Sequence, residues 1–220
     1  KKEFSSLKRE LDAQIAQQFT HLPFDHLLFT GATSIASHVL HAAADNLTPV
    51  TLELGGKSPS IVAQNADLKE SARRIAFGKT MNAGQTCVAP DYVLVHSSQQ
   101  DAFIQAYMDA LKQFYPNSIE GNPDYTAIVN ARQFDRLQHY LTDAHAKGAQ
   151  LVQEHTEPDG RRMPHVVVTN VNDDMALMQN EIFGPILPIV CYEQIDEAIA
   201  YINARERPLA LYYFGYNKAE

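Results

Sequence analysis

Cysteine is scarce in this 220-residue sequence: only Cys87 and Cys191 are present, with no Cys-x-x-Cys pair. Nothing therefore resembles a disulfide framework, and a reducing, cytoplasmic setting is the expectation. Long hydrophobic runs are also missing. The longest, Ile186–Tyr192, contains a proline and is far shorter than the roughly 20 residues of a membrane span. The amino end has no signal-peptide core.

Basic residues are few, with 18 Lys and Arg against 26 Asp and Glu, a formal net charge of −8. They are dispersed, so the basic stripe that nucleic acid requires is absent and we predict no nucleic-acid partner. His38 and His41 lie one helical turn apart, but no further ligand at metal-site spacing accompanies them, so we predict no metal site. The hydrophobic fraction of 45% excludes a disordered chain.

Short β-rich runs alternate with longer amphipathic runs, a pattern typical of an α/β fold with a largely parallel sheet. The pattern predicts strands near His26–Thr30, Val50–Leu54, Ser60–Val62, Tyr92–His96, His165–Val171, Ile186–Tyr192 and Ala210–Phe214. It predicts helices near Asp12–Phe19, Ser34–Ala44, Leu68–Ala83, Gln99–Tyr115, Ala131–Ala146 and Gln194–Arg205.

Some boundaries carry their own signal. Asp67 is placed to cap the helix that begins at Leu68, and Gly148 stands where a glycine ends a helix. The segment Glu154–Pro164 is polar turn material that we expect to join two strands. Lys1–Leu11 is charged and helix-like.

Cys87 lies in a segment, Asn82–Pro90, that follows a predicted helix and precedes a predicted strand. Gly84 lets the backbone turn tightly, so the thiol can be presented to a cleft. A thiolate there could attack a carbonyl, and the backbone N–H of Cys87 could hold the resulting oxyanion. The alternative is a buried cysteine acting as a small hydrophobe. Cys191 sits in a continuous apolar strand, and we predict that it is such a core residue.

Glu53 lies between two leucines at the end of a predicted strand, in the segment Leu52–Pro59. A carboxylate there is costly to bury unless it faces a polar cleft or has a raised pKa, and either condition suits a general base for water. The alternative is an outward residue of an alternating strand, followed by a turn at Gly55 and Gly56. The residues Gly56, Lys57 and Ser58 match the end of a phosphate-binding loop. That motif also requires a glycine five residues before Gly56, and Thr51 occupies this position.

Two further segments could bind a ligand. Gln179–Pro185 combines an acid, Glu181, and an aromatic, Phe183, with a Gly-Pro turn, which could grip a sugar diol and pack a ring; a hydrophobic turn would look much the same. Phe29–Thr33 is a strand end that enters a helix N-terminus and could receive a phosphate, or Thr33 could simply cap that helix.

Together these segments resemble the aldehyde dehydrogenase superfamily. Leu52–Pro59 is similar to its glutamate signature, Gly84–Cys87 to its cysteine signature and Glu181–Pro185 to its cofactor-ribose motif. The order of the three and the separation 87 − 53 = 34 agree with the family. The resemblance to the class 3 and coniferyl aldehyde dehydrogenase branch rests on further segments, namely Pro23–Gly31, Cys87–Val95, Arg207–Tyr212, Gly121–Thr126 and Asp173–Gln179.

The resemblance implies a three-layer αβα catalytic domain over residues 55–220, with a mostly parallel sheet, and an incomplete Rossmann-like NAD(P)-binding domain over residues 1–54. Family members are about twice as long as this chain. We therefore expect the 220-residue chain alone to oxidise aldehydes poorly or not at all, and the full-length enzyme to be a homodimer.

The resemblance also implies the residue roles. Cys87 would attack an aldehyde, such as coniferyl aldehyde or a related aromatic aldehyde, and Glu53 would activate the water that hydrolyses the thioester. The cofactor would be NAD or NADP. It would be contacted by Thr30 and Gly31 at the pyrophosphate, Leu54 and Gly55 along the nicotinamide, Glu181 at the nicotinamide ribose and Phe183 beside it.

Two other functions stay open on the residues alone. Cys87 and Glu53 also resemble the machinery of a cysteine hydrolase or acyltransferase, although no histidine stands at a recognisable partner position. The chain could instead be a non-catalytic folding or oligomerisation fragment.

Overall fold

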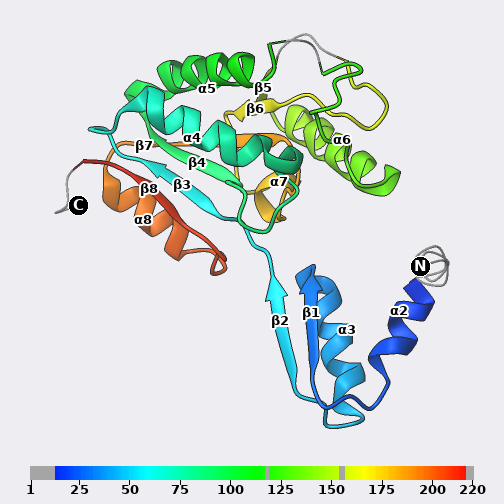
Figure 1. Ribbon diagram of the computed structural model, residues 1–220. Helices are drawn as coiled ribbons and strands as arrows, with labels where there is room; N and C mark the ends of the chain where they lie inside the picture. The colour runs from blue at the N-terminus through cyan, green and yellow to red at the C-terminus, as the bar shows by residue number, and fades with distance from the viewer. Residues whose placement is uncertain (1–12, 117–118, 154–156, 217–220) are drawn as a thin grey trace. The chain divides into compact units, whose positions relative to one another are not determined.

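The computed structural model describes residues 13–116, 119–153 and 157–216. The chain divides into two compact units, residues 1–55 and 56–220 (Figure 1), each of which is described by itself. The helix-like segment Lys1–Leu11 lies outside the described residues. No helix among the described residues is long and apolar enough to cross a membrane.

The first unit contains a βαβ arrangement preceded by a helix. Its elements are α2 (Ala13–Thr20), β1 (Leu27–Gly31), α3 (Thr33–Ala44) and β2 (Val50–Leu54). β1 and β2 pair in parallel, with Thr30 opposite Glu53 and Gly31 opposite Leu54. The carboxyl ends of both strands therefore bring four of the predicted site residues to one edge.

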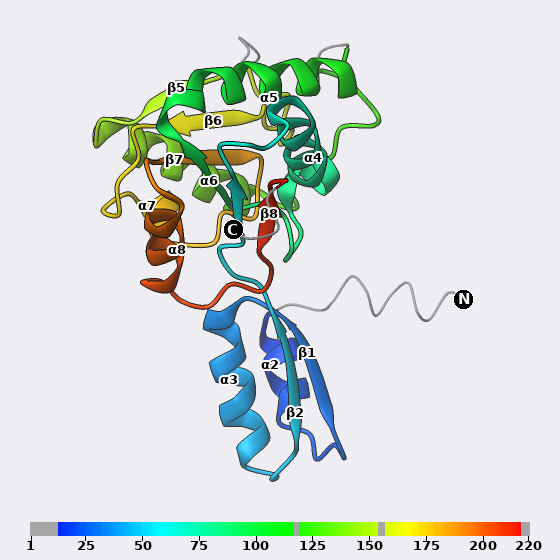
Figure 2. The same ribbon diagram turned by 90° about the vertical axis from the view of Figure 1, so that its left-hand side faces the viewer.

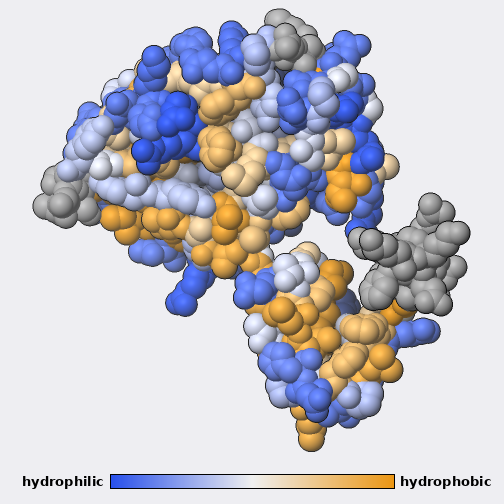
Figure 3. Space-filling model, in the orientation of Figure 1, coloured by the Kyte–Doolittle hydropathy of each residue, from blue (hydrophilic) through white to orange (hydrophobic). Residues whose placement is uncertain are grey.

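A two-stranded sheet with one helix packed on it leaves much of its apolar surface in solvent. The visible face of this unit carries many apolar side chains (Figure 3), and the exposed ones include Phe19, Leu22, Leu28, Ile35 and Leu47. Leu28 is 66% exposed, whereas its neighbour Leu27 is buried, and α3 packs against β1. The alternation of β1 thus gives one covered and one open face.

The second unit is built on a six-stranded sheet with the order β5-β6-β7-β4-β3-β8. The strands are β3 (Pro59–Val62), β4 (Tyr92–His96), β5 (Gln150–Val152), β6 (Val166–Thr169), β7 (Ile186–Tyr192) and β8 (Tyr212–Phe214). Every pair is parallel except β5 with β6. This confirms the predicted α/β class with a mostly parallel sheet.

Helices cover both faces of this sheet (Figures 1 and 2). They are α4 (Leu68–Thr80), α5 (Gln100–Phe114), α6 (Ala131–Ala146), α7 (Ala176–Gln179) and α8 (Ile195–Asn203), with single 3-10 turns at Met81–Gly84 and Ser97–Gln99. Val93 and Val95 pack with α4 and α5, whereas Leu94 packs with α8. Since successive strand residues face opposite sides, the unit has the predicted three αβα layers.

The helix boundaries follow local chemistry. Asp67 accepts a hydrogen bond from the Glu70 N–H at 2.9 Å, which confirms the predicted cap of α4. Gly148 has φ +95° just after α6, and its N–H bonds to the carbonyl of His145 at 3.0 Å, as expected of a terminating glycine. The predicted polar connection does join two strands, β5 and β6, although residues 154–156 lie outside the described part.

Three local features were not predicted. β5 is only three residues long and α7 is a single turn, so neither produces a periodic signal. The predicted helix Leu68–Ala83 ends early, at Thr80, because Asn82 and Ala83 adopt left-handed backbone angles, with φ +51° and +54°.

The prediction that Cys191 is a core residue is wrong. Its side chain is exposed, and its thiol donates a hydrogen bond to Gln100 Oε1 at 2.8 Å. Gln100 is the first residue of α5, so the strand runs past the helix that covers this face and Cys191 lies at its rim. Partial burial and the negative charges of Glu193 and Asp101 raise the pKa of this thiol.

Candidate active site

Cys87 follows a short left-handed turn. Asn82, Ala83 and Gly84 all have positive φ, the last at +73°. Such angles are unusual for residues other than glycine and are typical of functional sites held in place by their surroundings. The Cys87 side chain is exposed at the end of this segment, so the reading of Cys87 as a buried small hydrophobe does not hold.

Gln85 holds the cysteine segment from inside. Its buried side chain donates to the carbonyls of Asn82 at 3.0 Å and Ala127 at 3.2 Å, and it accepts from the Val129 N–H at 2.9 Å. One amide therefore ties the turn to a segment about 40 residues away. This constraint offsets the cost of the left-handed backbone.

Tyr212 holds the other side of the cysteine. Its hydroxyl donates to the carbonyl of Val88 at 2.6 Å. Partial burial, followed by the charge of Cys87, raises the pKa of Tyr212. The sequence singled out Arg207–Tyr212 only as a resemblance, because nothing local shows that β8 returns beside the cysteine.

The segment Gln179–Pro185 connects α7 to β7. Glu181 is partly buried, and burial raises the pKa of its carboxyl group, while a hydrogen bond from the Gly56 N–H opposes this shift. Phe183 has φ +49° and its side chain is 38% exposed. The loop thus presents a carboxylate and an aromatic ring from a constrained backbone.

The cysteine segment and this loop contact each other through backbone. A Cβ on Gly84 would lie 2.4 Å from the carbonyl oxygen of Gly184. Gly184 is itself covered by Leu137, whose Cδ1 would be 2.5 Å from an added Cβ. The structure therefore brings the segment of Cys87 beside the segment of Glu181 and Phe183, which are almost 100 residues apart in sequence.

Thr30, Gly31, Glu53 and Leu54 lie in the first unit, with Gly55 as its last residue. β2 alternates, so Thr51 and Glu53 are exposed, whereas Leu52 and Leu54 are only partly so. The exposure of Glu53 agrees with both interpretations of this residue. It is an outward-facing residue of an alternating strand, and its carboxylate is accessible to water, as a general base requires. Thr33 is the first residue of α3 rather than its cap, since Ala32 occupies the N-cap position without a side-chain bond.

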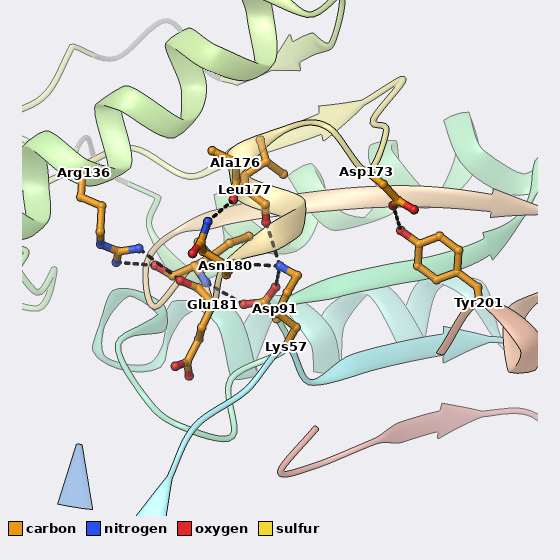
Figure 4. A network of polar contacts seen from close by, with 10 residues as sticks. Lys57, Asp91, Arg136, Asp173, Ala176, Leu177, Asn180, Glu181 and Tyr201 are labelled. Atoms are coloured by element: carbon orange, nitrogen blue, oxygen red, sulfur yellow. Dashed lines mark hydrogen bonds and ion pairs between the residues drawn. The ribbon is translucent and has the colours of Figure 1, made fainter. Parts of the chain in front are cut away.

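Lys57 and Asp91 were not predicted as site residues. Lys57 forms an ion pair with Asp91 Oδ1, and both side chains lie inside the second unit (Figure 4). The pair links the glutamate signature with the segment that follows Cys87. A signal was available, because Asp91 directly precedes a buried strand, where an unpaired carboxylate would be costly. Among the described residues, no group of acids, histidines and cysteines could hold a metal ion.

The segments of the second unit meet at one edge of its sheet. Lys57 precedes β3, Cys87 and Asp91 precede β4, and Glu181 precedes β7. Because these three strands are adjacent and parallel, their amino ends lie at the same edge. Ligands of open α/β sheets commonly bind at the carboxyl ends instead. The four predicted site residues on β1 and β2 do follow that rule.

Comparison with known families decides the identity: the aldehyde dehydrogenase family matches residues 9–220. The chain belongs to the aldehyde dehydrogenase family. The resemblance inferred from the three signatures is thereby confirmed, and this aldehyde dehydrogenase chain has relatives among the coniferyl and the family 3 aldehyde dehydrogenases.

The most similar relatives include coniferyl aldehyde dehydrogenases. A probable coniferyl aldehyde dehydrogenase of Pseudomonas aeruginosa is 58% identical over 211 residues, 96% of this chain and 44% of the relative. The coniferyl aldehyde dehydrogenase of Pseudomonas sp. strain HR199 is 48% identical over 215 residues, 95% of this chain and 44% of the relative. Aldehyde dehydrogenase family 3 member A2 of Rattus norvegicus is 47% identical over 195 residues, 88% and 39% of the two chains. The chain thus spans less than half the length of these relatives.

Solved aldehyde dehydrogenases share the fold. The substrate-bound AldH of Staphylococcus aureus superposes with a TM-score of 0.87 at 44% identity, covering 94% of this chain and 45% of that one. Betaine aldehyde dehydrogenase of the same organism, solved with NAD+, gives a TM-score of 0.83 at 28% identity, covering 93% and 42%. Structures of this family are therefore known with a bound nicotinamide cofactor.

Proposed function

We propose that the aldehyde dehydrogenase carrying this chain oxidises an aldehyde to a carboxylic acid with NAD or NADP, through a covalent intermediate on Cys87. The observation that carries the proposal is the contact between the Cys87 segment and the loop of Glu181 and Phe183. That contact brings the segment of an exposed thiol against the loop that carries a carboxylate and an aromatic ring, which supports the proposal.

The chemistry of the chain's own residues runs in two stages. The Cys87 thiolate attacks the carbonyl carbon, a C–S bond forms, and the new oxyanion accepts a hydrogen bond from the Cys87 N–H. A nicotinamide cofactor held by Glu181 and Phe183 would supply the hydride acceptor that converts this adduct of Cys87 into a thioester. Glu53 then takes a proton from water, the water oxygen attacks the thioester carbon, and the C–S bond breaks to release the acid and restore the thiolate.

The residues present suit a dinucleotide. The partly buried Glu181 carboxylate can accept hydrogen bonds from a ribose diol, and Phe183 offers an exposed ring. Thr30 and Gly31 end β1 just before α3, whose first turn has no acidic residue to repel a pyrophosphate. Ala32 has no hydroxyl, so only backbone N–H groups serve there. Leu54 ends β2 and Gly55 follows it, and both would lie along the nicotinamide in this proposal.

We propose coniferyl aldehyde or a related aromatic aldehyde as the substrate, because the relative at 58% identity carries that name. The proposal extends to a homodimer located in the cytoplasm, with residues 1–54 as part of the cofactor domain and residues 55–220 as the catalytic domain.

To test the proposal, the complete enzyme is assayed with a panel of aldehydes, and the formation of NADH or NADPH is measured by absorbance. Cys87→Ala should abolish both reduction of the cofactor and acyl transfer. Glu53→Gln should still reduce one equivalent of cofactor rapidly but should lose steady-state turnover, because the thioester would accumulate. Full steady-state turnover in Cys87→Ala would overturn the proposal.

A further inference from the structure

We propose that Lys57 and Asp91 act as positioning residues, forming a buried ionic clamp that fixes the loop Asn180–Gly184 in the orientation that presents Glu181 and Phe183. The inference rests on the function proposed above for those two residues. Neither member of the pair touches reacting atoms in this scheme; each acts on the backbone of the loop.

Lys57 uses all three ammonium donors inside the protein. Besides the ion pair with Asp91, Nζ donates to the carbonyls of Leu177 at 2.7 Å and Asn180 at 3.0 Å. Leu177 belongs to α7 and Asn180 is its C-cap, where carbonyls lack an intrahelical partner. An ammonium at this end is favourable, and it fixes the point at which the loop leaves the helix.

Asp91 likewise uses both carboxylate oxygens. Oδ1 faces Lys57, whereas Oδ2 accepts the Ile182 N–H at 2.8 Å. Its side chain is only 3% exposed, against 16% for Lys57. Ile182 lies between Glu181 and Phe183, so this bond holds the peptide that joins the two proposed cofactor contacts.

Arg136 grips the same peptides from α6. Its guanidinium donates to the carbonyl of Glu181 at 3.1 Å and to that of Ile182 at 2.7 Å. The backbone of the loop is thus held on both sides, while the Glu181 carboxylate points away from Lys57 and Asp91 (Figure 4). The main chain from which that carboxylate extends is thus fixed, and the Gly56 N–H donates a hydrogen bond to the carboxylate itself.

The pair also joins three neighbouring strands. Lys57 lies two residues before β3, Asp91 one residue before β4, and the clamped loop leads into β7. Lys57 Nζ further lies 5.7 Å from the centroid of the Tyr92 ring, at the start of β4. A pair confined to one strand could stabilise the fold only, whereas this pair also links the loop to the strand that follows the cysteine segment.

The first experiment measures amide hydrogen exchange in the peptide covering residues 178–185 of the purified 220-residue chain. Asp91→Asn keeps the shape of the side chain and removes its negative charge. Lys57→Met keeps an unbranched apolar side chain and removes the ammonium group. Each should speed exchange in this peptide by at least about tenfold, because a charge-assisted bond inside the protein is lost. Glu70→Gln is the matched control, since it removes the charge of an exposed pair with Arg73 and Arg74 in the same unit.

A double-variant cycle separates a clamp from two independent contacts. Lys57→Met combined with Asp91→Asn should exchange no faster than the faster single variant, because the two residues act as one device. The clamp is overturned if the effects of the two single substitutions on the exchange rate multiply in the double variant. It is also overturned if exchange in the single variants stays within twofold of the parent. A third contrary result is exchange that rises only as much as the loss of global stability, measured by urea unfolding, accounts for. Should either single variant fail to fold, Lys57→Met with Asp91→Leu removes both buried charges, and parent-like exchange there also overturns the clamp.

The second experiment tests whether the clamp serves the cofactor. In the complete enzyme, Asp91→Asn should raise the KM for the nicotinamide cofactor by about fivefold or more and change the kcat less, whereas a purely structural role would lower the amount of active enzyme without changing KM. An unchanged KM overturns the positioning role. The two proposals can fail separately. If the exchange data support the clamp but the complete enzyme oxidises no aldehyde, the proposed function is refuted and the clamp is not.

Discussion

Gly84 and Gly184 approach so closely that a Cβ on Gly84 would lie 2.4 Å from the carbonyl oxygen of Gly184. This contact joins the cysteine segment to the loop of Glu181 and Phe183. No side chain fits between the two backbones, so this close approach requires glycine at position 84.

We expect Gly84→Ala to lower the free energy of unfolding by roughly 1–3 kcal/mol, because the substitution combines a positive φ with a clash against backbone. Urea unfolding of the chain measures the change. Gly160→Ala is the control, since Gly160 has φ +60° but an added Cβ would meet nothing within 4 Å. Equal losses in both variants would show that the close approach contributes nothing.

Iodoacetamide should distinguish the two cysteines at neutral pH. Cys87 is exposed, whereas the pKa of the Cys191 thiol is raised and its hydrogen goes to Gln100. Since the thiolate is the reactive form, Cys87 should be alkylated first. Mass spectrometry should show that early labelling disappears in Cys87→Ala and persists in Cys191→Ala. The opposite result would contradict the assignment of Cys87 as the nucleophile.

Tyr212→Phe removes only the hydroxyl that holds Val88 beside the cysteine. We expect the free energy of unfolding to fall by about 1 kcal/mol, as for the loss of a typical hydrogen bond. The alkylation rate of Cys87 should also differ from that of the parent chain. Tyr216→Phe is a suitable control because that side chain is 72% exposed. If the two variants behave alike, the phenol of Tyr212 does not hold the segment.

His165 should make the second unit sensitive to acid. It is buried, neither ring nitrogen has a hydrogen-bond partner among the described residues, and burial followed by the nearby positive charge of Lys79 lowers its pKa to about 3. The unfolded chain therefore binds one more proton than the folded chain between the ordinary histidine pKa near 6.5 and about 3. Stability falls as the pH is lowered through that window, by roughly 1.4 kcal/mol per pH unit from this group.

The variant His165→Phe isolates this effect. Phenylalanine preserves a ring against Tyr125, whose centroid lies 6.0 Å from that of His165, and it takes no proton. Unfolding measured at pH 7, 6 and 5 should give a shallower decline in the variant than in the parent. Parallel declines would mean that His165 is not the group responsible.

The sequence was informative wherever the determining contacts are local. The strand and helix periods, the Asp67 cap and the Gly148 terminus all depend on neighbours a few residues away, and all appear in the structure. It failed at β5, at α7 and at Cys191, where the outcome depends on which distant element covers a short segment. The ribose and cysteine motifs were recognisable, but their mutual contact was not.

By itself, then, the amino-acid sequence determined the α/β class, the aldehyde dehydrogenase membership and the residues nominated for chemistry, because these depend on residue type, period and spacing along the chain. Only the tertiary structure decided that Lys57 faces Asp91, 34 positions away, and the carbonyl of Leu177, 120 positions away. The physical reason is that three parallel strands bring their amino ends to one edge, where buried donors and acceptors must find partners irrespective of their separation in the chain.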